Sequence, residues 1–324
     1  MGDEAASETA SSGVDVRPML DPAMRDAFGT FELPDMNADV LMTIRSSSLP
    51  PAQLSGRVER TDHLVPGEPP VPVRVHRSAG AEGTLPAILT IHGGGYIIGS
   101  YDMDDALLDR WCQNLGLVGV SVQYRLAPET PYPGAVEDCY AALRWTHQHA
   151  HELGIDPACI GIQGISAGGG LAAALALLAR DRGEVPVAFQ LLDCPMLDDR
   201  QTTPSIGADG LYVWTGASNV FGWRSYLGDL YGSTEVPPYA AAARAMNLSD
   251  LPPACVVVGA IDGFRDEDID YAQRLNQAGV PCELHVLAGM PHAYQLAASA
   301  PAVVLAEQCK EDWLARQLAR PATP

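Results

Sequence analysis

Ser166 lies in the short motif Gly164-Ile165-Ser166-Ala167-Gly168, between an apolar run and a segment rich in alanine and leucine. A serine in a G-x-S-x-G motif that follows a strand and begins a helix occupies a strained turn, and this turn exposes its hydroxyl for nucleophilic attack. Its neighbours must be small because backbone atoms approach closely there. Ser166 is therefore the candidate nucleophile, and the alternative is a glycine-rich turn without chemistry.

A glycine triplet in His92-Gly93-Gly94-Gly95-Tyr96 also follows an apolar run. It matches the HGGG motif whose backbone N–H groups contribute to the oxyanion hole of esterases. Glycine amides can approach a substrate oxygen closely because no Cβ intervenes. We expect two amides of this loop and the amide of Ala167 to bind the oxyanion. His92 is expected to shape the loop rather than to act as a base.

A nucleophilic serine needs a base, and the base needs a carboxylate that orients it. In the fold typical of this serine motif, these residues follow one another in the order serine, acid, histidine. Of the eight histidines, only His285 and His292 follow Ser166. His285 alternates with apolar residues inside a predicted strand, whereas His292 lies in the loop beyond that strand. His292 is therefore the predicted base.

Asp262 is the predicted acid because it comes soon after the apolar run that ends at Gly259. The carboxyl edge of an open α/β sheet, where such a run ends, is where functional groups of this fold class collect. Asp266, Glu267 and Asp268 are rivals. They fall where a helix is predicted to begin, and we interpret them as capping and helix-dipole charges.

Weaker patterns favour other functions. Gly168-x-Gly170-x-x-Ala173 fits a dinucleotide-binding fingerprint, but the serine turn explains the same glycines. His147 and His151 have a spacing that could bind a metal, and we favour a solvated helix end instead. Arg125 and Glu129 are expected to support the loop beneath the oxyanion strand rather than to contact substrate.

Apolar runs alternate with helical patterns over most of the chain. Continuous apolar strands separated by helices are typical of a parallel sheet that is buried on both faces. The predicted fold class is therefore α/β, with a mostly parallel central sheet flanked by helices and preceded by an antiparallel hairpin. The predicted strands are 58–63, 71–76, 87–91, 118–122, 159–163, 187–192, 254–259 and 282–287, and the predicted helices are 22–31, 36–46, 104–115, 135–152, 168–182, 267–277 and 302–318.

Residues 201–243 interrupt this alternation, because such connections are commonly about two to six residues long. Together with the tail and helical patterns of residues 1–50, this insertion is predicted to form a helical cap over a catalytic core of residues 51–200 and 244–324. The first 14 residues are predicted to be a disordered tail.

Six of the chain's 21 aromatic residues fall within residues 212–231 of this insertion. Trp214 and Trp223, with Tyr96 of the glycine loop, are candidate walls of a substrate pocket. The alternative is that these aromatic side chains only hold the cap together.

Forty acidic residues face 20 basic ones, which gives a net charge of −20. A surface of this charge repels nucleic acid and anionic lipids. The only lysine, Lys310, lies outside any P-loop or Ser-Lys motif and is a poor candidate for a Schiff base.

Seven cysteines without a C-x-x-C pattern predict reduced thiols in a cytoplasmic protein. The uncharged stretches 83–101 and 157–179 approach the length of a membrane span, but each contains a glycine triplet, so we expect a soluble protein.

Taken together, the motifs resemble the hormone-sensitive-lipase-like family of α/β-hydrolase carboxylesterases, over nearly the whole chain from about residue 20. They are HGGG at 92–95, YRLAPE at 124–129, GIDP at 154–157, GISAGG at 164–169 and DGFRDE at 262–267. Within the family the chain looks most like the bacterial heroin-esterase group, through GGGLAA at 168–173 and PVAFQ at 186–190. The resemblance implies the nucleophile Ser166, the acid Asp262, the base His292, and an oxyanion hole formed by Gly94, Gly95 and Ala167.

Three positions depart from the family pattern. Ile165 stands before the nucleophile, where relatives usually carry Asp, Thr or Glu. Gly263 replaces a proline beside the acid, and Ala293-Tyr294 replaces the Gly-Phe that commonly follows the base. All three leave the triad intact, so they bear on rate and substrate range.

The residues and the resemblance predict a carboxylesterase that hydrolyses short-chain acyl esters through an acyl-enzyme, with no metal or other cofactor. Its expected partner is a small-molecule ester, with no nucleic acid and no membrane, and a homodimer is one candidate assembly. The alternatives are a non-catalytic small-ligand receptor on the same fold and an arylester- or amide-specific hydrolase.

Overall fold

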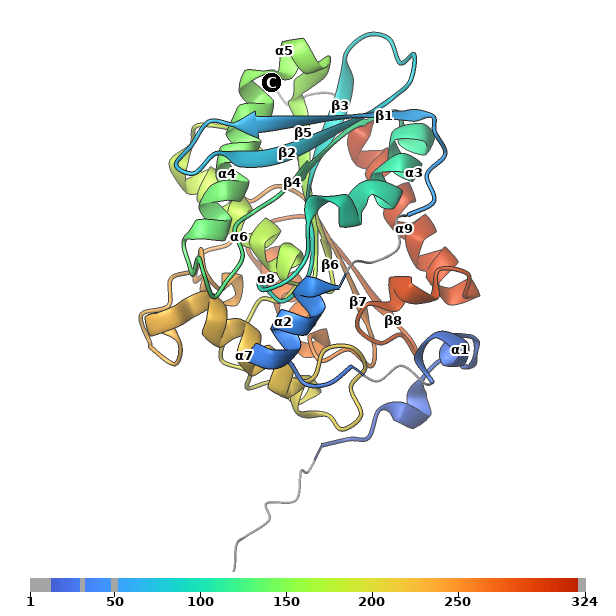
Figure 1. The fold of residues 1–324 in the computed structure, drawn as a ribbon, viewed down its shortest axis with the longest axis vertical. Helices are drawn as coiled ribbons and strands as arrows, with labels where there is room; N and C mark the ends of the chain where they lie inside the picture. Colours follow the sequence, from blue (N-terminus) through green and yellow to red (C-terminus); the bar gives the residue numbers. More distant parts are fainter. Residues whose placement is uncertain (1–12, 30–32, 48–51, 320–324) are drawn as a thin grey trace, which may run out of the picture.

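A mostly parallel sheet of eight strands forms the centre of the molecule (Figure 1). The computed structural model describes residues 13–29, 33–47 and 52–319, so the predicted disordered tail lies almost entirely outside the described residues. The strands are β1 (Val58–Val65), β2 (Val71–Ser78), β3 (Leu85–Ile91), β4 (Val118–Val122), β5 (Ile155–Ile165), β6 (Gln190–Asp193), β7 (Ala254–Gly259) and β8 (Cys282–Leu287). Their order across the sheet is β1-β2-β4-β3-β5-β6-β7-β8.

The strand pairing confirms the predicted fold class. β1 pairs antiparallel with β2, β2 pairs antiparallel with β4, and the later pairs are parallel. β4 and β7 are buried along their whole length, as their continuous apolar sequences require. The strand predicted over 187–192 is shorter than expected. It begins at Gln190, because β7 on its other side begins opposite that residue.

Helices cover both faces of the sheet (Figure 1). They are α3 (Asp105–Leu115), α4 (Gly134–Gln148), α5 (Ala150–Leu153), α6 (Ala167–Arg182), α8 (Arg265–Gln277) and α9 (Pro301–Leu318). Apolar side chains of α4, α6 and α8 belong to one buried cluster, and those of α3 and α9 belong to a second. The predicted helix 135–152 is divided at His149, where the backbone leaves helical geometry.

The carboxyl ends of the central parallel strands meet at one edge of the sheet. Ile91 of β3 is paired with Gly164 of β5, and Ile165 of β5 with Asp193 of β6. The loops that follow these strands therefore begin side by side, which is the arrangement that places a functional site in this class of fold.

The N-terminal segment and the inserted segment contact each other beyond this edge. The N-terminal helices are η1 (Arg17–Met19), η2 (Pro22–Met24), α1 (Arg25–Phe28) and α2 (Ala38–Ser46), and the insertion holds η4 (Ser205–Gly207), α7 (Gly216–Leu227) and η5 (Gly228–Leu230), with η6 (Ala242–Arg244) at its end. The Met36 amide donates to Ser218 Oγ at 3.0 Å, and the rings of Phe28 and Tyr212 pack edge to face. These contacts join the two segments that the sequence predicts to form a cap, and the cap and its boundaries stay a prediction.

The uncharged stretches of the sequence belong to the core. Residues 83–101 contain β3 and the glycine loop, and residues 157–179 contain most of β5 and α6. No helix in the described part of the chain combines the length and the apolar character needed to cross a bilayer. The seven cysteines are free thiols, of which Cys112, Cys139, Cys194 and Cys255 are buried.

Candidate active site

Ser166 occupies the turn between β5 and α6. Its φ of 58° and ψ of −122° are strained for a residue with a side chain, as expected for a nucleophile on such a turn. A Cβ at Gly164 would lie 2.0 Å from the carbonyl oxygen of Gly168, and a Cβ at Gly168 would lie 2.0 Å from the carbonyl oxygen of Ile91. Neither glycine can therefore be replaced without moving the backbone of the turn.

The imidazole of His292 joins the candidate nucleophile to the candidate acid. Its Nε2 lies 2.9 Å from Ser166 Oγ, and its Nδ1 lies 2.7 Å from Asp262 Oδ2. An ionised carboxylate only accepts hydrogen bonds, so Nδ1 carries the proton and Nε2 is free to accept the proton of the serine. The structure thus brings together the three residues predicted from their order in the chain.

The three side chains are almost covered. Ser166 and His292 are each 6% exposed, and Asp262 is 2% exposed. The second oxygen of Asp262 accepts the Phe264 amide at 2.9 Å, and the ring of Phe264 packs edge-on against the imidazole. Burial strengthens the electrostatic coupling between the acid and the base, and the amide fixes the orientation of the carboxylate.

The rival acids have other partners. Asp266 Oδ2 accepts the Ser205 amide, and hydrogen bonds from Arg265 and Ser205 outweigh the effect of burial and lower the pKa of Asp266. Glu267 Oε1 accepts the amides of Leu197 and Asp198 in the segment after β6. Burial raises the pKa of Glu267 well above its usual range.

The interpretation of these acids as helix-dipole charges agrees with their place in the first turn of α8, but their interpretation as caps is wrong. The N-cap residue Phe264 makes no side-chain capping bond, and the Asp266 amide donates instead to Ser205 Oγ of the inserted segment at 3.2 Å. Asp266 reaches the inserted segment and Glu267 reaches the loop after β6 because α8 starts between these two segments. Asp268 is fully buried, and its burial together with the nearby carboxyl groups raises its pKa well above the usual value.

The glycine loop lies directly beside the nucleophile. A Cβ at Gly93 would lie 3.3 Å from Ser166 Cβ. Gly94 and Gly95 have φ values of 116° and 60°, which glycine adopts readily. Among the backbone hydrogen bonds of the described residues, none is donated by Gly94, Gly95 or Ala167. Their amides are therefore available to an anionic oxygen, and Ala167 also begins a long helix whose dipole favours negative charge there.

His92 supports the glycine loop through a contact with the backbone of Gly93 and a stacked ring. Its Nδ1 lies 2.8 Å from the carbonyl oxygen of Gly93, and its ring stacks on Tyr124. Complete burial lowers the pKa of His92 to about 4, so the ring is neutral near pH 7. The imidazole that lies within hydrogen-bond distance of Ser166 Oγ is that of His292.

The three aromatic residues predicted to line a pocket lie at different depths. Trp214 is nearest to the chemistry, because a Cβ at Gly95 would lie 2.0 Å from its ring. Tyr96 and Trp223 pack together with Tyr226 and are fully buried, and the Tyr96 hydroxyl donates to the carbonyl oxygen of Met196. In this conformation the side chains of Tyr96 and Trp223 are not exposed to a bound substrate. Their direct contact with a substrate therefore stays a prediction.

Arg45 is a site-supporting residue that sequence reasoning missed. From α2 of the cap, its guanidinium donates to the carbonyl oxygens of Ile97 and Ala127 at 2.8 and 2.7 Å and pairs with Glu129. It therefore fastens α2 both to the glycine loop, at Ile97, and to the loop that follows β4, at Ala127. The preferred supporting role of Glu129 agrees with this contact. Arg125 likewise makes paired hydrogen bonds to Asp138 within the core.

One of the two candidate metal ligands, His147, is occupied by another contact. His147 Nε2 lies 2.9 Å from the carbonyl oxygen of Pro186, and burial lowers the pKa of His147. Among the described residues, one group has the spacing of a metal site: Cys194, Asp262 and His292. Asp262 and His292 are hydrogen-bonded to each other, and this bond accounts for the proximity of those two groups.

Two departures from the family pattern have visible consequences. A Cβ at Gly263 would lie 2.8 Å from Ile206 of the inserted segment, so the cap occupies the space that a proline ring would fill. Ala293, which follows the base, has a φ of 56°, a left-handed conformation in which glycine is favoured. The structure offers no partner that would explain Ile165.

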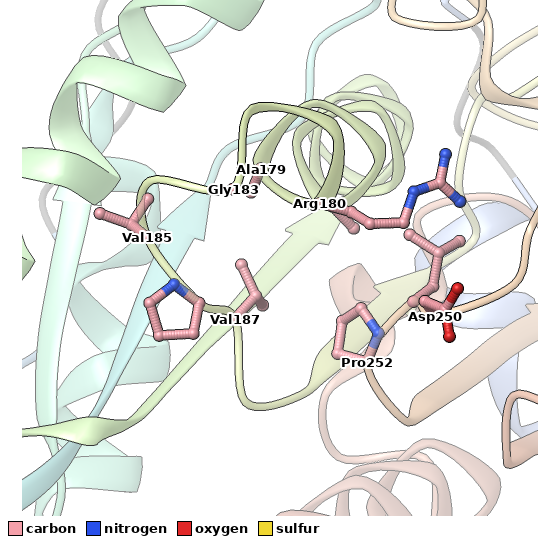
Figure 2. Close-up of a pocket in the computed structure, with 10 residues that line it drawn as sticks. Ala179, Arg180, Gly183, Val185, Val187, Asp250 and Pro252 are labelled. Carbon is pink, nitrogen blue, oxygen red and sulfur yellow. The ribbon is translucent and has the colours of Figure 1, made fainter.

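Two cavities are relevant to the location of a ligand. The cavity in Figure 2, of about 360 Å³, is lined by Ala179, Arg180, Val187 and Asp250. It lies at the far end of α6, about 20 Å from the serine turn at 1.5 Å per residue. A second cavity of about 530 Å³ lies between the two parts of the cap, with Phe28 on one side and residues 210–213 and Thr215 on the other. The lining of this cap cavity includes Val213 and Thr215, the two sequence neighbours of Trp214, whereas Ser166, Asp262 and His292 do not line it.

Comparison with known proteins identifies the relatives of the chain. A family model described as alpha/beta hydrolase fold matches residues 88–296. The chain belongs to this family. It is 36% identical to carboxylesterase NlhH of Mycobacterium tuberculosis over 286 residues, which cover 86% of this chain and 89% of the relative. It is 32% identical to ethyl acetate hydrolase of Pseudomonas putida over 228 residues, covering 69% and 71%.

A solved structure of a bacterial heroin esterase superposes with a TM-score of 0.87 at 38% identity, covering 94% of this chain and 99% of the other. These similarities confirm the predicted membership of the hormone-sensitive-lipase-like α/β hydrolases. Because these relatives are named as esterases and ester hydrolases, they also confirm the expectation that the protein is an ester hydrolase.

Proposed function

We propose that this protein is a serine carboxylesterase that cleaves short-chain acyl esters through an acyl-enzyme. The observation that carries the proposal is the double contact of His292, with Nε2 at 2.9 Å from Ser166 Oγ and Nδ1 at 2.7 Å from Asp262. A serine hydroxyl is a weak nucleophile until a base accepts its proton, and a buried carboxylate stabilises the base once it is charged.

In the acylation step His292 Nε2 accepts the proton of Ser166 as Oγ attacks the ester carbonyl carbon. The carbonyl oxygen becomes an oxyanion beside the amides of Gly94, Gly95 and Ala167. Donors fixed in advance stabilise this charge without reorganising, and removal of one such donor costs about 2.7 to 4 kcal/mol in a related reaction. His292 then protonates the leaving alcohol, and the acyl group stays on Ser166.

In the deacylation step His292 accepts a proton from water, which attacks the acyl carbon. The second oxyanion occupies the same three amides. Collapse of this intermediate releases the carboxylic acid and returns the proton to Ser166. Asp262 stays ionised throughout and holds Nδ1 as the protonated nitrogen.

The cap supports a preference for small substrates. The cap cavity of about 530 Å³ is the size of a site for a small molecule. Trp214 packs against Gly95 and occupies space next to the reacting carbonyl. We propose that Trp214 forms one wall of the acyl site, with Tyr96 and Trp223 behind it. The names of two relatives, heroin esterase and ethyl acetate hydrolase, are in keeping with small esters.

The contacts of His292 argue against a non-catalytic receptor, and the cysteines bear on the location of the protein. A non-catalytic receptor on this fold does not need an aligned base, whereas His292 here is hydrogen-bonded on both nitrogens. The free thiols support the expected cytoplasmic location, and a small ester remains the proposed partner.

The test is a panel of p-nitrophenyl esters from acetyl to palmitoyl, with one matching p-nitroanilide, run on the wild type and on Ser166→Ala and His292→Ala. We expect hydrolysis by the wild type and a loss of several orders of magnitude in each variant, since triad members act as a unit. Activity that survives in Ser166→Ala would refute the nucleophile, and faster cleavage of the anilide would favour an amidase. Circular dichroism of each variant checks that it is folded.

A further inference from the structure

The only lysine of the chain is buried beneath the candidate active site. Lys310, on α9, is 2% exposed, and its Nζ lies 2.7 Å from the carboxylate of Asp193, which is fully buried at the end of β6. Burial alone would lower the pKa of Lys310, but the carboxylates of Asp193 and Glu307 outweigh it and raise that pKa to about 12. A buried ion pair contributes little net stability compared with apolar residues of similar size, so its presence here calls for another explanation.

Asp193 connects the nucleophile to the loop that carries the base. Its carbonyl oxygen accepts the Ser166 amide at 2.8 Å. Its carboxylate accepts the Tyr294 hydroxyl and the Gln295 side-chain amide, each at 2.8 Å. Tyr294 and Gln295 follow His292 by two and three positions, so one residue bonds to both of the segments whose separation must be correct for proton transfer.

The loop of His292 is also held on its other side. The carbonyl oxygen of Met290 accepts the Ile261 amide at 3.2 Å, which links the loop to the residue before Asp262. The Met290 bond therefore fixes the base relative to the acid, and the bonds to Asp193 fix it relative to the nucleophile. These two attachments flank His292 and can be broken independently.

We infer that Asp193, neutralised by Lys310, is a positioning residue that holds the His292 loop at its working distance from Ser166. Neither residue touches the substrate. The carboxylate must be ionised to accept bonds from Lys310, Tyr294 and Gln295 together, and the ammonium group makes that charge tolerable in the interior. This inference rests on the proposed function, because it assigns a role in proton transfer from Ser166 to His292.

The first test removes both buried charges with Asp193→Asn combined with Lys310→Met. Glu307, the other partner of Lys310, keeps its ion pair with Arg110. The matched control is Asp109→Asn combined with Arg60→Met, which removes a partly buried pair between α3 and β1 that has no link to the His292 loop. For p-nitrophenyl butyrate we expect kcat of the first double variant to fall on the order of 10-fold to 100-fold with little change in KM, since a displacement of about 1 Å can cost that much. The control should keep the wild-type kcat.

The downfield proton resonance of the His292 to Asp262 hydrogen bond provides a second readout. We expect it to persist in the Asp193 and Lys310 double variant, because the Met290 attachment is untouched. A wild-type kcat in that variant, an equal loss in the control, or loss of the resonance would each overturn the inference.

Tyr294→Phe keeps the charge pair and removes one hydroxyl, so it decides the question if the double variant does not fold. We expect a several-fold fall in kcat with a lowered melting temperature, because a buried hydrogen bond to a carboxylate is lost, and a wild-type kcat would overturn the inference. Ser166→Ala is measured alongside. If it stays active, the proposed function fails. If it is inactive while the positioning variants match the wild type, only the role of Asp193 fails.

Discussion

At the carboxyl edge of the sheet close approaches of the backbone fix the chain, whereas the cap is fastened by side-chain hydrogen bonds together with backbone bonds such as that from the Asp21 amide to the carbonyl oxygen of Gly289. Gly164, Gly168 and Gly93 each lie where a Cβ would come within 3.0 Å of a backbone atom. The cap is held by bonds such as those of Arg45 to the carbonyl oxygens of Ile97 and Ala127.

The difference has a physical consequence. A backbone approach of that kind admits one residue type, so the serine turn and the glycine loop can change little without losing their geometry. A bond from a long side chain can be supplied from several positions and by several residue types. The edge is therefore suited to keep the chemistry constant, and the cap is suited to vary the substrate.

The largest effect is expected from replacing a carboxylate at the edge of the sheet, Asp262, and the comparison is with Asp266, a carboxylate that bonds to the inserted segment. Asp262→Asn places an amide against Nδ1 of His292 and favours the wrong tautomer, so we expect kcat to fall on the order of 10⁴-fold. Asp266→Asn weakens contacts with Arg265 and with Ser205 of the inserted segment, and we expect less than about a tenfold change. Steady-state kinetics with p-nitrophenyl butyrate measure both. A larger loss at Asp266 would move the acid to that position.

Two tryptophans of the inserted segment separate packing from specificity. Trp223→Ala removes a fully buried ring, and we expect the free energy of unfolding to fall by about 3 to 5 kcal/mol with the same preferred acyl length. Trp214→Ala should shift the preferred length from about butyryl or hexanoyl towards longer chains, because each buried CH₂ contributes about 0.8 kcal/mol where there is room. Urea denaturation and the ester panel distinguish the two. An unchanged optimum in Trp214→Ala would assign that ring to packing alone.

Arg45→Met tests whether the cap supports the glycine loop. The substitution keeps an apolar stem and loses the bonds to two carbonyl oxygens and to Glu129, so we expect kcat/KM to fall about tenfold. Arg182→Met is the matched control, since it removes a surface pair with Glu137 away from the loop. Equal values for both variants would show that the cap is not needed to shape the oxyanion loop.

The smallest expected effect comes from Ala293→Gly beside the base. The left-handed conformation of Ala293 costs about 1 to 2 kcal/mol, and glycine removes this strain. Glycine also loses more backbone entropy on folding than alanine, which offsets about 0.5 to 1 kcal/mol of the gain. We expect the free energy of unfolding to rise by about 1 kcal/mol or less, with kcat unchanged. Thermal denaturation and steady-state kinetics check the two parts. A marked destabilisation would mean that the methyl group makes contacts that outweigh the strain.

Much of the edge was predictable because its constraints are local. The glycines around Ser166 and the order of Ser166, Asp262 and His292 can be read in the chain, and the structure places those three side chains in contact. The acids at the start of α8 show the limit of such reasoning. Their position in the first turn was predicted correctly, but their partners lie in segments far away in the sequence.

The sequence by itself determined the fold class, the serine turn, the glycine loop and the candidate triad. Close backbone approach and strained turns restrict residue type at fixed spacings, and these spacings are visible without coordinates. Only the tertiary structure decided that Arg45 fastens the cap and that Lys310 neutralises Asp193 across 117 positions of the chain. A charged side chain carries no mark of its partner, because the pairing depends on which strand ends and helices the fold brings together.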